Sequence, residues 1–148
     1  MLETNLIKLT NKLIIMITEL IIKQLEEMGF ELKEVPEIGY VFQYEESNML
    51  FMPDEDDDSF VRFSLPHIYD VTDDNMTMLL EIINELNVTL KFIQVCALHD
   101  GVWVIYEHRF YAGDNLEDLL GHILRLLQFT AFMFQKKLNG DFELDMED

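Results

Sequence analysis

The chain has 148 residues, 49% of them hydrophobic, with 10 lysines and arginines against 29 aspartates and glutamates. This length fits one compact domain that can bury a core without disulfides or a structural metal. The net charge of −19 argues against direct binding to nucleic acid or to anionic membranes, because both need clustered bases. A basic protein partner fits this charge better.

The first predicted element is a helix from about Asn5 to Met28, because apolar residues recur there at helical spacing. They form two neighbouring stripes: Leu6, Leu9, Leu13, Met16 and Leu20 in the first, and Ile14, Ile17, Ile21, Leu25 and Met28 in the second. Gly29 is a natural residue to end the helix. Two stripes make an apolar sector wider than one contact with a sheet requires, which indicates a buried or interface-forming helix.

The apolar stretch Leu13–Ile22 inside this helix is too short to cross a membrane, and Glu19 interrupts it. It also lacks the basic flank and the small-residue cleavage site of a signal peptide. Cys96 is the only cysteine, so no disulfide can form within the chain, and a reducing compartment fits best. We therefore expect a cytoplasmic protein.

Three strands are predicted next, because apolar and polar residues alternate with a period of two. They are Tyr40–Glu46, Met49–Met52 and Phe60–Ile68, with a turn at Ser47-Asn48 and an acidic loop from Pro53 to Asp58. Together they predict a three-stranded antiparallel meander.

A short amphipathic helix opened by Thr72-Asp73-Asp74 follows the meander. Two further strands are predicted at Thr89–Leu98 and Val102–Tyr111. The Asp100-Gly101 pair between them is a preferred sequence for a type I′ hairpin turn. In a two-residue loop at that position, we expect Leu98 to face Trp103.

The last predicted helix is introduced by Asp114-x-x-Glu117, which resembles a capping box, and runs to about Leu138. Residues 141–148 carry acids and no base, so they are expected to be a disordered acidic tail. The element order is α-β-β-β-α-β-β-α. It predicts an α+β fold in which an antiparallel sheet packs with two long helices and one short helix. Residues 1–140 are expected to form a single domain.

Local likeness to a known group of proteins lies in Lys91-Phe92-Ile93-Gln94-Val95, in Val102–His108 and in the long helix Leu116–Leu138. With this element order, size and acidity, the chain resembles the type III secretion chaperone-like fold and the YbjN-like bacterial proteins over roughly residues 5–138. Members called chaperones typically dimerise and bind an extended segment of a client protein. Many other members have no assigned activity, so the resemblance implies a protein-binding role by analogy.

Catalytic and metal-binding patterns are missing from the sequence. The four histidines have no i,i+4 pairing and no second cysteine beside them, which argues against zinc. Asp54, Asp56 and Asp58 have the spacing of a calcium loop, but the glycine and glutamate that an EF-hand needs are absent. Cys96 sits in an apolar strand and is expected to be a small buried hydrophobe. We expect no cofactor, no metal and no enzymatic activity.

The apolar surplus on the first and last helices favours a contact surface for another protein. Ile15 and Ile22 interrupt the polar side of the first helix, and Phe129 and Met133 widen the apolar face of the last one. We expect these four residues to contact a protein client, and the same surplus allows a homodimer. The alternative is an acidic regulatory or sensory module that binds a signalling protein or a small ligand.

Overall fold

The structure is a computed structural model that describes residues 2–54, 56, 60–110, 113 and 115–140. Within the first helix it describes the side chains of residues 4–6 and from 17 onward. In chain order, the elements are α1 (Leu2–Glu27), β1 (Lys33–Val35), β2 (Gly39–Tyr44), β3 (Ser47–Pro53), β4 (Phe60–Asp70), α2 (Met76–Thr89), β5 (Ile93–Leu98), β6 (Gly101–Arg109) and α3 (Leu116–Leu138).

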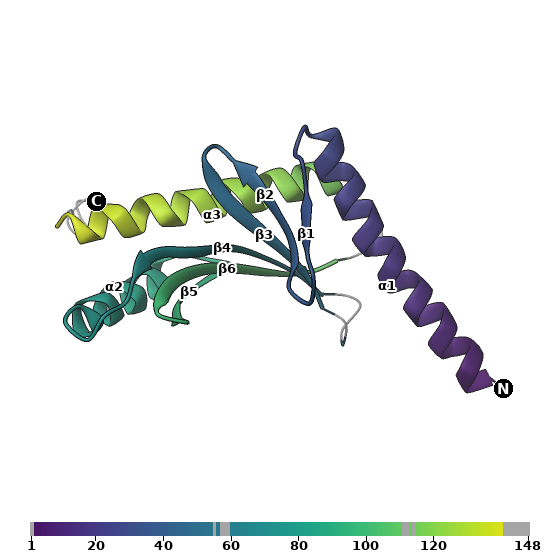
Figure 1. Ribbon diagram of the computed structural model, residues 1–148, viewed down its shortest axis with the longest axis horizontal. Coiled ribbons are helices and arrows are strands. Elements are labelled where there is room, and N and C mark those ends of the chain that lie inside the picture. The colour runs from purple at the N-terminus through teal and green to yellow at the C-terminus, as the bar shows by residue number, and fades with distance from the viewer. Residues whose placement is uncertain (1, 55, 57–59, 111–112, 114, 141–148) are drawn as a thin grey trace.

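The strands form one antiparallel sheet in the order β1-β2-β3-β4-β6-β5 (Figure 1). This confirms the α+β fold with two long helices and one short helix. The short edge strand β1, which sequence analysis did not predict, precedes the predicted meander. Its three residues, Lys33-Glu34-Val35, are too few to show an alternating pattern.

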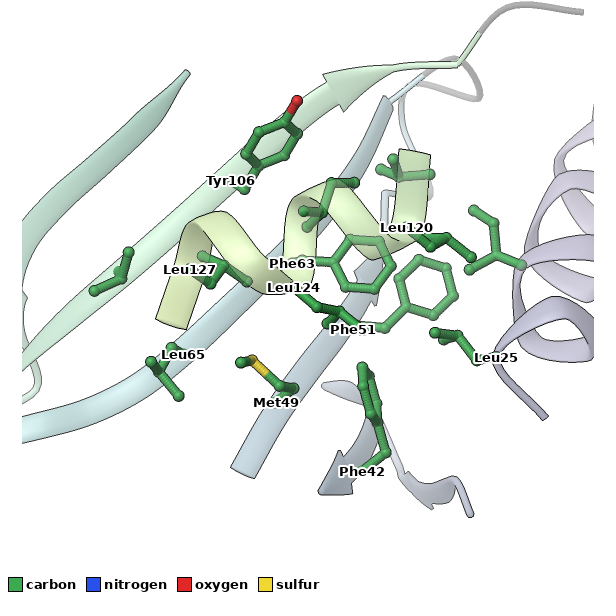
Figure 2. Close-up of a cluster of buried hydrophobic side chains, with 14 of the residues drawn as sticks. Leu25, Phe42, Met49, Phe51, Phe63, Leu65, Tyr106, Leu120, Leu124 and Leu127 are labelled. Carbon is green, nitrogen blue, oxygen red and sulfur yellow. The ribbon is translucent and has the colours of Figure 1, made fainter. Parts of the chain in front are cut away.

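The main core lies between one face of the sheet and the helices α1 and α3. Phe51 and Phe63 stack with their ring centroids 4.9 Å apart, and Tyr40 stacks on Phe51 at 6.0 Å. Leu25 from α1 and leucines from α3 close over these rings (Figure 2). The second of the two apolar stripes of α1 therefore faces the core, where Ile21 and Leu25 are fully buried.

The helix α2 packs against the same face of the sheet at its other end. Its buried residues contact Val95, Val102 and Phe134 in a second apolar cluster. Asn87, inside α2, donates its side-chain amide to the carbonyl of Val95 and accepts a hydrogen bond from the N–H of Val95. This pair of bonds occupies the outer edge of β5 with a side chain, where another strand would otherwise pair.

Two predicted turns are displaced in the structure. The β2–β3 turn is at Glu45-Glu46, so Ser47 and Asn48, predicted as the turn, begin β3 instead. The β5–β6 turn is at His99-Asp100, so Leu98 faces Gly101 rather than Trp103. Gly101 is the first residue of β6, and a side chain there would overlap the ring of His67.

The Glu45-Glu46 turn offers a stabilising substitution. Both residues have positive φ angles, 46° and 74°, which Asn and Gly adopt at lower cost than Glu. Glu45→Asn combined with Glu46→Gly should raise the free energy of unfolding by about 1 kcal/mol, because it removes this strain. Urea unfolding of the variant and of a control, Glu81→Asn on α2, measures the gain. An equal gain in the control would refute this explanation.

The start of α3 differs by one residue from the expected capping box. Asn115 is the N-cap, and its side-chain oxygen accepts a hydrogen bond from the N–H of Asp118 at 3.1 Å. Asp114 and the acidic tail at 141–148 lie outside the described residues. Among the helices described, none is both long enough and apolar enough to span a membrane.

Candidate functional site

The corner where α1 meets β1 is built by the C-terminal cap of the helix. Gly29, at φ 98°, donates its N–H to the carbonyl of Glu26, and Phe30 donates to the carbonyl of Leu25. These two bonds form a Schellman motif, in which glycine supplies the left-handed residue after the helix. The motif directs Phe30 onto the sheet, where its ring lies 5.3 Å from Phe42 and 6.0 Å from Tyr44.

Gly39 sets the position of β1 on the sheet. It begins β2 with a φ of 149° and pairs with Val35. A side chain at this position would overlap the carbonyl oxygen of Phe51 on β3. Glycine therefore permits the close approach of β2 to β3 from which the β1–β2 hairpin extends.

Of the hollows that border β1, two adjoin the segment that leads from α1 into the strand. The α1-side hollow, about 500 Å³, lies between β1 and the end of α1 and is lined by Ile22, Glu26, Gly29, Phe30, Glu31, Leu32, Glu34 and Tyr40. The Val41-side hollow, about 630 Å³, is lined by residues 29–33 and 41–43. Glu34 pairs with Tyr40 and Lys33 with Val41, so these pairs point to opposite faces of the sheet. The hollows therefore lie on both sides of one strand.

The α1-side hollow combines aromatic surface with negative charge. Phe30 and Tyr40 are half-buried, whereas Glu26, Glu31 and Glu34 are exposed. Its lining contains no lysine or arginine. We refer to the outer edge of β1 together with the two hollows as the β1 edge site.

The predicted contact residues separate into different regions. Ile22 lines the α1-side hollow and packs against the main core. The side chain of Ile15 lies outside the described residues, although its backbone is within α1. The sequence analysis missed the three glutamates and Phe30. Exposed glutamates are abundant in this chain, so residue type alone could not identify Glu26, Glu31 and Glu34 as members of a site.

The two predicted residues on α3 lie elsewhere. Phe129 is 48% exposed, next to Phe132, which is 54% exposed and carries the ammonium group of Lys136 over its ring at 5.1 Å. Met133 packs against the second apolar cluster, beside α2. The structure thus does not bring Phe129 and Met133 together with Ile22 in the β1 edge site.

The face of the sheet opposite the helices is uncovered by any helix in the described part of the chain. It presents apolar side chains of β3 and β6, including Leu50, Trp103 and Ile105. Arg62 and Glu107 form an ion pair across it at 2.9 Å. Leu50 is only 4% exposed although it belongs to neither core cluster. Its neighbours on this face therefore already shield it from solvent.

Cys96 lies opposite Trp103 and is half-buried. Burial raises the pKa of its thiol, because a low-dielectric surrounding disfavours the thiolate. Alkylation by iodoacetamide should therefore be slower than for a small-molecule thiol and should still be rising at a pH where that thiol has reached its plateau. A rate–pH profile measures this, with the urea-unfolded chain as control. Coincident profiles for folded and unfolded chains would contradict the expected shift.

Among the residues described, no group of three or more His, Cys, Asp or Glu side chains is placed to hold a metal ion.

Comparison with solved structures identifies proteins that share this architecture. No protein-family profile matches the sequence, and none of the curated proteins does. YbjN from E. coli, described as a candidate transcription regulator, superposes with a TM-score of 0.62 at 9% identity over 82% of this chain and 92% of its own. The chain has a YbjN-like fold. An uncharacterised protein from Methanothermobacter thermautotrophicus also superposes on this chain, with a TM-score of 0.56 at 23% identity over 80% of this chain and 96% of its own.

Proposed function

We propose that this chain is a protein-interaction module that binds an extended segment of a partner protein along β1. The single observation that carries the proposal is an edge strand with a hollow on each of its faces. In this proposal the chain acts by binding rather than by catalysis, and it does so in the cytoplasm without a cofactor.

The two edges of the sheet differ in a way that supports this choice. Asn87 occupies the outer edge of β5 by bonding both backbone groups of Val95. The outer edge of β1 pairs with no strand of the described chain. An added strand could therefore form backbone hydrogen bonds with β1. Successive side chains of an added strand point to opposite faces, so they would enter the two hollows alternately.

The charges of the site support a segment that mixes apolar and basic residues. Phe30 and Tyr40 offer apolar contact, and Glu26, Glu31 and Glu34 offer carboxylates to lysine or arginine. The net charge of −19 would also speed the approach of a basic partner.

Defined peptides test the proposal. A fluorescein-labelled peptide of alternating leucine and lysine should bind. Glu34→Lys should weaken the affinity for this peptide by about tenfold, because Glu34 is part of β1 and lines the α1-side hollow, so the substitution reverses a charge in the binding site. Glu81→Lys on α2 makes the same change in net charge at an exposed site far along the sheet and should weaken binding much less. Fluorescence anisotropy gives both affinities.

Three peptide controls separate strand addition from general attraction between opposite charges. A serine–lysine peptide, a leucine–glutamate peptide and a leucine–lysine peptide with alternate backbone amides methylated should all bind poorly. Equal binding of the serine–lysine peptide, or equal effects of Glu34→Lys and Glu81→Lys, would show that only bulk charge is at work. Unchanged affinity of the methylated peptide would rule out pairing with β1.

A regulatory role is the second candidate. This chain shares its fold with YbjN, which is described as a candidate transcription regulator, and that likeness favours a regulatory role. The charge of −19 then favours an action through a protein rather than through direct contact with DNA. Reporter expression in cells carrying wild-type chain or Glu34→Lys tests it. A response that Glu34→Lys abolishes would support regulation through the β1 edge site, and no response to the wild type would contradict it.

A further inference from the structure

The N-terminal half of α1 projects away from the sheet and the other helices (Figure 1). The core holds the C-terminal half through the second stripe, with Ile21 and Leu25 fully buried. The first stripe is left without a partner at its two described members, since Leu6 is 65% exposed and Leu20 is 47% exposed. A helix with one apolar stripe packed and a second one free has surface for another helix.

The spacing of the first stripe indicates which kind of partner fits. Leu6, Leu9, Leu13, Met16 and Leu20 follow one another at intervals of three, four, three and four residues. These are the a and d positions of a heptad repeat, the pattern of helices that pair along a seam. The pattern runs from Leu6 to Leu20 within the helix Leu2–Glu27, so the complementary surface is a second helix with the same repeat.

The charges along α1 favour a second copy of the same helix in the opposite direction. Residues 4–18 contain Lys8 and Lys12 and no acid, whereas residues 19–27 contain three glutamates and one lysine. In an antiparallel pair, the basic half of each helix faces the acidic half of the other. A single two-fold axis relates these two contacts, so they are identical. This arrangement also holds the two acidic bodies at opposite ends of the helix pair, where they repel each other least.

We propose that two copies of this chain pair antiparallel through the first stripe of α1. The interface is self-complementary, so it closes at a dimer. The seam lies on a different face of α1 from the Ile22 side that lines the α1-side hollow, so pairing leaves the β1 edge site free. Self-association and the proposed peptide binding are therefore independent properties.

Sedimentation equilibrium tests the dimer. The wild type should have twice the chain mass of 17.5 kDa, and Leu6→Asp should raise the dimer dissociation constant by about a hundredfold. Thr4→Asp is the matched control, because it adds the same charge to the same exposed end of the helix outside the seam. Leu20→Asp should also dissociate the dimer. Circular dichroism checks that each variant keeps its fold.

The direction of pairing has its own readout. A spin label on Lys23→Cys in a Cys96→Ala background should give a label separation above about 30 Å in an antiparallel pair, given the rise of about 1.5 Å per residue. A separation below about 20 Å would show parallel pairing and overturn the proposed arrangement. A monomeric wild type up to its solubility limit, or equal dissociation by Leu6→Asp and Thr4→Asp, would overturn the seam itself.

Discussion

Truncating Phe51 to alanine should lower the free energy of unfolding by about 3–5 kcal/mol. Phe51 is fully buried at the centre of the main core, with Phe63 stacked on one side and Tyr40 on the other. Removing the ring leaves a cavity bordered by strands and two helices, which cannot all move inward to fill it. Urea-induced unfolding followed by circular dichroism measures the loss.

Phe129→Ala is the matched control for this substitution. It removes the same ring from a position that is 48% exposed on α3, so it should cost less than about 1 kcal/mol. Similar losses for the two variants would mean that the stacked rings are not the centre of the core.

Replacing Gly39 with alanine should cost about 2–4 kcal/mol, which is the second large effect. The positive φ of 149° is unfavourable for any residue with a side chain, and the added methyl group would overlap the carbonyl of Phe51. The methyl group meets backbone rather than a flexible side chain, so the β1–β2 hairpin has to shift. Thermal and urea unfolding give the change in stability.

Gly29→Ala separates the two contributions to this cost. Gly29 also has a positive φ, 98°, but a side chain added there meets only open space. Its replacement should therefore cost about 1 kcal/mol, the strain of the backbone alone. If Gly39→Ala costs no more than Gly29→Ala, close approach to Phe51 does not constrain the hairpin.

Much of the fold follows from hydrophobic periodicity in the sequence. Long amphipathic segments such as α1 and α3 repeat the helical pattern over several turns, so their type is unambiguous. The turns were harder to place. Glu45-Glu46 contains none of the residues that usually mark a turn. The Asp100-Gly101 pair predicted a turn at those two residues, but the turn lies one residue earlier, at His99-Asp100. In the second case the packing of His67 over Gly101 outweighed the local preference.

The candidate site was less predictable than the fold. Ile22 could be recognised because an isoleucine interrupts a polar helix face. β1 could not, because three residues show no periodicity and its role depends on its place at the sheet edge. Gly29 could be recognised as the end of the helix, but the β1–β2 hairpin that brings Glu34 to the same hollow as Phe30 and Glu31 depends on tertiary packing.

Hydrogen exchange of the β1 amides, with and without the leucine–lysine peptide, tests most directly whether a partner segment adds to this edge. We expect slower exchange at Glu34 when the peptide is bound, because Val35 already accepts a hydrogen bond from Ile38 within the hairpin and alternation leaves the backbone groups of Glu34 on the outer edge of β1. Exchange at β5 should stay unchanged, since Asn87 already holds Val95 there. Protection that appears on β5 or α3 while Glu34 exchanges as before would contradict binding at the β1 edge site.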